Sequence, residues 1–208
     1  MSKLDPTSFK KKLHYSHKKK TFRYKERDEK KRADFLEKIK EIPEKRLVFV
    51  DETGFQTFFT RMCGYALRGL RLLAERPGRK IQRLNVVGAM KDNKIIAASI
   101  YSENTNTQVF NTWVEDCLCK ALEPGDVVIL DNASFHKSKA TIELIEAVGA
   151  CVLFLPPYSP DFNKIEKFWG TLKKRVRGEA LMFEALKDAI KICITNTSDE
   201  ILAMTDSH

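Results

Sequence analysis

The sequence predicts an α/β fold in which helices cover the faces of a mixed sheet. Apolar runs of four to five residues at 47–50, 127–130 and 151–155 are typical of buried strands, which are short and rich in branched side chains. Segments whose apolar residues recur every three or four positions lie between and after these runs, as in helices that pack on one side. Strands and helices that alternate in this way predict a layered fold.

The N-terminal part of this fold is one helix followed by one central strand. A short apolar seam predicts a helix over about 24–42, and its members are Phe35, Leu36, Ile39 and Ile42. Pro43 closes that helix. The run at 47–50 then predicts a strand buried on both faces, which ends at Asp51.

The middle of the chain contributes a hairpin, a helix and a second buried strand. Residues 82–90 and 95–101 predict the hairpin, because Asp-Asn separates them. Helical spacing continues over 107–122 and stops before Pro-Gly. The strand at 126–131 repeats the earlier pattern, since it also ends in an acid, Asp131.

Four further elements complete the fold. Ser138 is a candidate cap for a helix over 141–148, and the strand at 151–155 is stopped by two prolines. Asn163 is a candidate N-cap for the next helix, whose apolar stripe is Ile165, Phe168, Trp169, Leu172 and Val176. A last helix is expected over 180–194, with a frayed end from about Thr195.

The excess of positive over negative charge lies in the N-terminal part of the chain. The net charge is +9, and residues 1–46 carry 17 Lys/Arg against 8 Asp/Glu, whereas the remaining 162 residues carry 20 of each. We therefore predict a basic arm and linker helix over 1–45, a folded domain over 46–195 and a frayed tail over 196–208. A basic arm suits nucleic-acid phosphates, although a solubilising tail has the same composition.

Cysteine usage and hydropathy exclude several protein classes. The five cysteines are odd in number and form no C-x-x-C pair, which indicates reduced cysteines without a zinc site or a disulfide framework. The charged N-terminus does not look like a signal peptide. The longest apolar runs, of four to five residues, are far shorter than the ~18 that span a membrane. We expect a cytosolic protein.

Three acids occupy equivalent places at the ends of strands or the start of the next helix. Asp51 and Asp131 end strands, and Glu166 lies in the first turn of the helix after the last strand. Taken alone, Glu166 would be interpreted as a solvated side chain near the positive end of a helix dipole. Because sites in such sheets lie beyond the carboxyl ends of adjacent strands, we expect the three carboxylates to converge.

Converging carboxylates indicate a cation, since like charges repel one another. Oxygen-only donors select hard ions such as Mg²⁺, which shares its coordination shell with phosphates and water. Two such ions, roughly 3.5–4 Å apart, can activate an attacking oxygen and stabilise a leaving oxygen at phosphorus. Basic segments at 68–83 and 173–177 suit a phosphodiester substrate.

Several stretches, in a fixed order, carry a resemblance to a known family. They are FVDETGF at 49–55, GYALRG at 64–69 with PGR at 77–79, LDNASFHK at 130–137, and LPPYSPDFN at 155–163 followed by Ile165, Glu166, Trp169, Leu172 and Lys173. From about residue 23 to 194 the chain resembles bacterial insertion-sequence transposases of the mariner-related group, the insertion-sequence 630 family. Thirty-four residues separate Asp131 from Glu166, the spacing that this group shows.

The resemblance implies a DDE transposase on a ribonuclease-H-like fold with a mixed five-stranded sheet flanked by helices. Asp51, Asp131 and Glu166 would be the catalytic and metal-binding residues. They would hold two Mg²⁺ ions, for which Mn²⁺ substitutes. The implied reaction is cleavage at transposon ends, followed by attack of the freed 3′ hydroxyl on target DNA, that is, DNA transposition and integration.

The resemblance also implies DNA contacts outside the acidic triad. The expected contacts are Arg68 and Arg79 in the basic stretches at 64–69 and 77–79, and Lys173, Lys174 and Arg177 in the helix that carries Glu166. His136 also falls near the site, where it would contact phosphate; a capping or packing role fits it equally well.

Two departures from the family pattern affect the expected partners. The family usually carries an N-terminal helix-turn-helix region, which nothing before Phe22 resembles, so a separate helix-turn-helix polypeptide is a possible partner. Lys164 stands where the family usually has Pro, and a cation there opposes the helix dipole. We expect a homodimer on DNA in the bacterial cytoplasm, associated with the nucleoid and not with a membrane.

Two other classes of function remain open. One is a ribonuclease-H-like endonuclease without strand transfer, which would need the same three acids. The other is an inactive or truncated DNA-binding remnant that keeps the fold and the basic surface. Joined DNA products would distinguish a transposase from the first, and loss of activity in Asp131→Asn would exclude the second.

Overall fold

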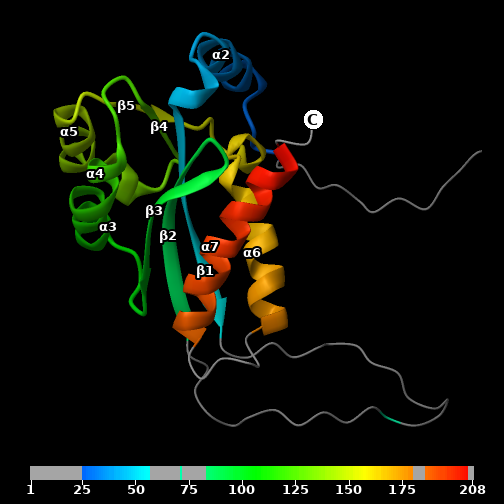
Figure 1. Cartoon of the computed structure of the whole chain (residues 1–208). Helices are drawn as coiled ribbons and strands as arrows, with labels where there is room; N and C mark the ends of the chain where they lie inside the picture. Colours follow the sequence, from blue (N-terminus) through cyan, green and yellow to red (C-terminus); the bar gives the residue numbers. More distant parts are fainter. Residues whose placement is uncertain (1–24, 57–70, 72–82, 180–185, 206–208) are drawn as a thin grey trace, which may run out of the picture.

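Five strands form one mixed sheet with helices on both faces (Figure 1). This computed structural model describes residues 25–56, 71, 83–179 and 186–205. The strand order is β3-β2-β1-β4-β5, with bounds β1 Leu47–Gln56, β2 Arg83–Lys91, β3 Lys94–Tyr101, β4 Val127–Leu130 and β5 Cys151–Phe154. β1 is central, because it pairs antiparallel with β2 and parallel with β4. The expected mixed five-stranded sheet is confirmed.

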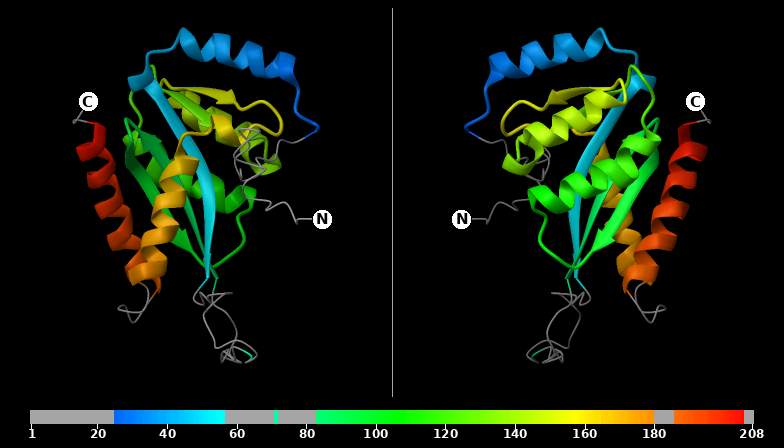
Figure 2. Two further views of the ribbon diagram at one scale, coloured as in Figure 1. Left: turned by 90° about the vertical axis from the view of Figure 1, so that its right-hand side faces the viewer. Right: turned by 90° about the vertical axis from the view of Figure 1, so that its left-hand side faces the viewer.

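The helices form two layers, one on each side of the sheet. α6 Ile165–Glu179 and α7 Leu186–Thr205 cover one face (Figure 1). The other face is covered by α3 Thr107–Trp113, the π-helical η2 Val114–Leu118, α4 Cys119–Ala121 and α5 Lys139–Ala147. α2 Glu29–Lys40 lies across the end of the sheet at which β1 begins (Figure 2). Three short 3₁₀ turns link these elements: η1 Glu44–Arg46, η3 Ser134–Lys137 and η4 Pro160–Phe162.

Side chains of β1 alternate between two hydrophobic cores. Leu47, Phe49 and Phe55 pack in the core beneath α6 and α7. Val48 and Val50 pack in the core beneath α3 and α5. This period of two is what a pleated strand with both faces covered requires.

Two strands differ from their sequence-based predictions. β1 does not end at Asp51 but runs on to Gln56, because β2 continues to pair with it after the parallel ladder with β4 stops at Phe49. β5 is an edge strand, so Cys151 is exposed and its neighbours are half-buried rather than fully buried. The hairpin is confirmed, and its turn residues Asp92 and Asn93 have the positive φ angles, 49° and 62°, of a tight two-residue turn.

The helix boundaries also shift. α2 begins at Glu29 because the Asp28 side chain accepts the backbone N–H groups of Lys30 and Lys31, and Leu36 faces solvent instead of joining the buried seam. The stretch 107–122 is helical as expected, with a π-helical segment in its middle. α7 extends to Thr205, past the predicted frayed end, since its sequence contains neither Gly nor Pro. In the described residues, no helix has the length and apolarity needed to cross a membrane.

Candidate active site

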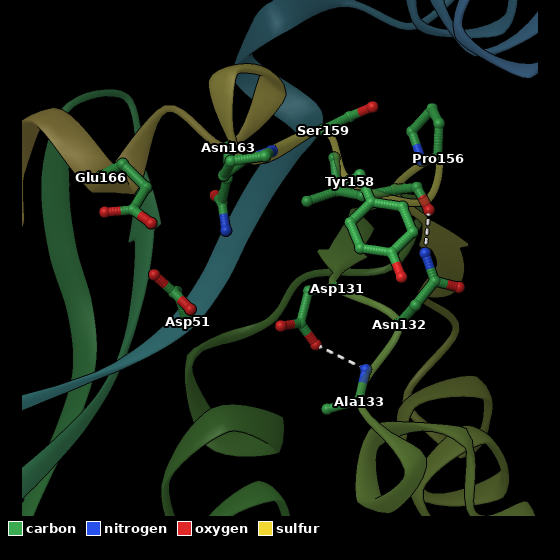
Figure 3. A pocket seen from close by; sticks show the side chains of 11 residues that line it. Asp51, Asp131, Asn132, Ala133, Pro156, Tyr158, Ser159, Asn163 and Glu166 are labelled. Carbon is green, nitrogen blue, oxygen red and sulfur yellow. Dashed lines mark hydrogen bonds between the residues drawn. The ribbon is translucent and has the colours of Figure 1, made fainter. Parts of the chain in front are cut away.

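The three predicted acids line one pocket (Figure 3). Asp51 comes from the middle of β1, Asp131 directly follows β4, and Glu166 lies in the first turn of α6. The pocket has a volume of about 360 Å³. The remaining lining comes from the loops after β4 and β5: Asn132, Ala133, Leu155, Pro156, Tyr158, Ser159, Pro160 and Asn163. The structure therefore brings together side chains that are far apart in the sequence.

Strand alternation explains why Asp51 faces Glu166. Asp51 shares the α6 side of β1 with Phe49 and Phe55, whereas Glu52 points to the opposite side. Gly88 of β2 pairs with Asp51, and a methyl group there would lie 2.8 Å from the ring tip of Trp169. The missing side chain at Gly88 thus lets α6 approach the sheet beside Asp51.

Asn163 joins the two elements that carry Asp51 and Glu166. Its side chain is buried, and its Nδ2 donates to the carbonyl of Val50 over 3.1 Å, next to Asp51. Its own carbonyl accepts the Glu166 N–H at 3.2 Å. The sequence predicted that the Asn163 side chain caps α6. That prediction is wrong, because the side chain bonds to β1 instead. Among the described residues, its Oδ1 has no hydrogen-bond partner.

Asp131 is fixed by a buried histidine. One oxygen, Oδ1, accepts the Ala133 N–H at 2.8 Å and His136 Nδ1 at 2.6 Å. The other ring nitrogen, Nε2, lies 2.9 Å from Glu52 Oε1. The ring has no solvent exposure and sits against Phe110.

The charges of this cluster reinforce one another. Burial lowers the pKa of His136, but hydrogen bonds to Asp131 and Glu52 outweigh burial and raise it to about 9. Burial likewise works to raise the pKa of Asp131, yet the bonds from His136 and Ala133 lower it overall. At neutral pH, both ring nitrogens therefore donate to carboxylates. The ring is fully buried and contacts Asp131, Glu52 and Phe110, and a contact of His136 with DNA stays a prediction.

Comparison with known proteins assigns the family. Residues 46–188 match the family model described as DDE superfamily endonuclease. The chain belongs to this family. Among proteins with curated descriptions, none matches the sequence.

Solved structures have the same fold as this chain. A Mos1 transposase paired-end complex with left transposon end matches with a TM-score of 0.61 and 16% identity, over 92% of this chain and 69% of that chain. A mariner Mos1 paired-end complex with Mg gives 0.57 and 17%, over 92% and 70%. A simian T-cell lymphotropic virus intasome gives 0.51 and 13%, over 74% and 48%. The chain thus has the ribonuclease-H-like fold of Mos1 transposase.

The acidic pocket is suited to a cation. Burial raises the pKa of Asp51 to about 7, and the nearby charges of Glu166, Glu52 and Asp131 add to the effect. A positive ion would relieve this repulsion, and carboxylate oxygens are donors that Mg²⁺ and Mn²⁺ prefer. As the described side chains stand, no three His, Cys, Asp or Glu residues lie close enough to hold one ion. One oxygen of Asp131, Oδ1, is already bonded to the Ala133 N–H and to His136 Nδ1.

The other predicted site residues lie on α6 or outside the described residues. Lys173 is half-buried, while Lys174 and Arg177 are exposed on α6. Arg68 and Arg79 lie outside the described residues. Lys164, the residue in place of the usual Pro, forms an ion pair with Glu44, which offsets its charge at the start of α6.

Sequence reasoning missed the roles of four residues in the acidic pocket and its surroundings. Glu52 anchors His136, and Asn163 bonds to β1. Asn132 donates through Nδ2 to the Leu155 carbonyl, which ties the two loops together. Tyr158 lines the pocket. All four lie inside the motifs that carried the family resemblance, but the spacing of those motifs did not indicate their partners.

Proposed function

We propose that this chain is the catalytic region of a transposase that cuts DNA strands and joins them to new sites in the presence of divalent metal ions. One observation carries the proposal: three carboxylates from separate elements line one pocket, where burial, together with the charges of neighbouring acids, raises the pKa of Asp51 to about 7. Such a cluster of like charges is unfavourable without a counter-ion, so its presence indicates that a cation binds there.

Asp51, Asp131 and Glu166 would hold two Mg²⁺ or Mn²⁺ ions. Bound ions of this kind activate an attacking oxygen and stabilise a leaving oxygen at phosphorus. Asp51 exchanges its proton for the cation, so its ionised form is the one that binds. His136 keeps Asp131 ionised and oriented, because it donates to the Asp131 carboxylate from a buried position. Asn163 sets the position of Glu166 relative to the strand that carries Asp51.

The finer assignment is a mariner-related transposase of the insertion-sequence 630 type. The names of the similar Mos1 structures mention transposon ends and Mg or Mn, which supports DNA and divalent metal as partners. We propose a homodimer on paired DNA ends in the bacterial cytoplasm, with a separate helix-turn-helix polypeptide for end recognition. Further DNA contacts would come from Arg68, Arg79, Lys173, Lys174 and Arg177.

A plasmid assay tests the proposal. Supercoiled plasmid and pre-cleaved DNA are incubated with Mg²⁺ or Mn²⁺ and with wild type, Asp131→Asn or Glu166→Gln. Glu143→Gln, an exposed acid on α5, is the matched control. We expect metal-dependent nicking by wild type and the control, and none by the two pocket variants. In parallel, Mg²⁺ should raise the thermal midpoint of wild type and the control only.

The products decide between the remaining alternatives. Joined DNA molecules identify strand transfer and therefore a transposase. Nicked DNA without joined products identifies a ribonuclease-H-like endonuclease. DNA binding with no cleavage in any sample, and no stabilisation by Mg²⁺, would contradict the proposal and leave a DNA-binding remnant.

A further inference from the structure

The loop between β5 and η4 holds an exposed aromatic ring at the edge of the acidic pocket. Tyr158 is 53% exposed and lines the pocket with the three acids. In Figure 3 its ring lies beside Asn132, across the pocket from Glu166. Leu36 and Ile192 are the other exposed large hydrophobic side chains in the described part of the chain, and neither lines this pocket.

The backbone at Tyr158 adopts a conformation that an aromatic residue rarely takes. Its φ is 54°, in the left-handed region. Within the described segments, the other non-glycine residues with positive φ are Asp92 and Asn93, which belong to a hairpin turn and to residue types that tolerate it. Strain of this kind persists where the surrounding structure enforces it, and it clusters at ligand sites.

Hydrogen bonds on both sides of Tyr158 hold the loop in place. Ser159 is buried, and its Oγ donates to the Pro157 carbonyl over 3.1 Å. The Phe162 N–H donates to the Ser159 carbonyl over 3.2 Å. On the other side, Asn132 donates to the Leu155 carbonyl. The ring is therefore presented by a braced loop, so little conformational freedom is lost when a ligand contacts it.

We propose that Tyr158 stacks on an unpaired nucleobase of the DNA strand whose phosphodiester enters the acidic pocket. The inference rests on the proposed function, since it requires DNA in this pocket. The face of the ring suits a base, whereas a phosphate accepts hydrogen bonds from cations, N–H groups or a hydroxyl such as that of Tyr158; Tyr158→Phe keeps the face and removes the hydroxyl. The base must be unpaired, because neighbours in a duplex cover the faces of a stacked base.

Fluorescence of 2-aminopurine tests this inference with the full chain. The probe is a short DNA duplex with a frayed end, in which 2-aminopurine occupies either the unpaired terminal position or an interior paired position. Each DNA is titrated with wild type, Tyr158→Phe, Tyr158→Leu and Ile192→Ala. We expect quenching at the unpaired position with wild type, Tyr158→Phe and Ile192→Ala. With Tyr158→Leu the quenching should be lost, and binding of frayed DNA should weaken roughly 10-fold.

A second variant separates stacking from damage to the fold. Tyr158→Gly removes the ring and also the strained φ, so its thermal midpoint should be no lower than that of wild type. It should still lose the quenching. Unchanged quenching in Tyr158→Leu and Tyr158→Gly would overturn the stacking inference alone, as would equal losses in Tyr158→Phe and Tyr158→Leu. If wild type binds none of these DNAs, the proposed function fails together with the inference.

Discussion

At the scale of single residues, Asp51 links stability to pH. Its pKa is raised to about 7 from an ordinary value of 3.8, so between these values the folded protein binds a proton that the unfolded chain has lost. Stability should therefore fall as pH rises from about 4 to about 7, and this contribution should then level off. Asp51→Asn removes the effect. We expect the variant to gain thermal stability over wild type at pH 8, and much less at pH 4, in metal-free buffer.

His136 titrates at higher pH than Asp51, so it does not obscure the comparison of wild type with Asp51→Asn. Its pKa of about 9 is raised from 6.5, so its stabilising contribution is complete below pH 6.5 and is lost as pH rises through about 9. Both proteins keep His136, and its contribution largely cancels in the difference between them. A difference between wild type and Asp51→Asn that stays constant from pH 4 to 8 would contradict a raised pKa at Asp51.

Asn163 gives a second prediction at this scale. Asn163→Ala removes the bond to the Val50 carbonyl and frees the start of α6 from β1. Because residues that orient metal ligands typically contribute 10–100-fold to affinity, we expect Mg²⁺ binding to weaken by roughly 10-fold in titration calorimetry. As the control, Lys167→Ala changes an exposed residue next to Glu166 in the first turn of α6 and should not weaken Mg²⁺ binding. Equal Mg²⁺ affinities of Asn163→Ala and wild type would exclude the orienting role.

At the scale of secondary-structure elements, α6 depends on a glycine in the neighbouring strand. Gly88→Ala places a methyl group 2.8 Å from the buried Trp169 ring, so the ring and α6 must move. Overpacking of this kind typically costs about 1–3 kcal/mol, which urea denaturation will measure. The control is Gly170→Ala at an exposed position of α6, where nothing lies within 4 Å of the added methyl group. It should stabilise the protein by about 0.5–1 kcal/mol.

A latch joins α2 to the turn that precedes the Glu166 helix. Arg32 donates to both oxygens of Asp161, over 3.0 and 2.7 Å, and its guanidinium lies 4.0 Å above the Phe162 ring. Phe35 stacks on the same ring, with centroids 5.6 Å apart. The position of α2 is thereby coupled to η4 and to Asn163 beyond it.

Breaking this latch should destabilise the fold measurably. In Arg32→Ala we expect a loss of about 1 kcal/mol, which corresponds to a thermal midpoint roughly 2–4 °C lower. Arg32→Lys should recover only part of this, because lysine cannot make the two parallel bonds. Lys31→Ala removes an exposed pair with Asp28 and should leave the midpoint nearly unchanged. A midpoint for Arg32→Ala equal to that of Lys31→Ala would show that the latch contributes nothing.

At the scale of the whole molecule, local sequence patterns predicted the strands of the sheet. Features that depend on contacts between distant residues, such as the end of β1 and the partners of His136 and Asn163, could not be predicted from those patterns. Apolar runs that end in Asp51 and Asp131 are visible in the sequence because strand composition is a local property. The continuation of β1 to Gln56 depends on pairing with β2. The burial of His136 depends on Glu52, 84 residues away, and the role of Asn163 on Val50, 113 residues away. The spacing of apolar residues along the sequence does not predict contacts between residues so far apart.

The charge distribution of the whole chain predicts how DNA binding responds to salt. The excess of Lys/Arg over Asp/Glu lies in residues 1–46, whereas the rest of the chain is balanced. If the arm neutralises phosphates, each lost contact should reduce the slope of log K against log salt concentration by about 0.9 for duplex DNA. We expect the triple variant Lys18→Gln, Lys19→Gln, Lys20→Gln to lower that slope by up to about 2.7 in binding measurements over a range of salt concentrations.

The control for this test removes three lysines outside the arm. Lys120, Lys139 and Lys191 are exposed on α4, α5 and α7, and their triple change to Gln alters the net charge by the same amount. If net charge alone governed binding, both triple variants would lower the slope equally. If the arm contacts the DNA, only the first will. Metal-dependent nicking by the arm variant should persist at low salt, because the three acids of the pocket are unchanged.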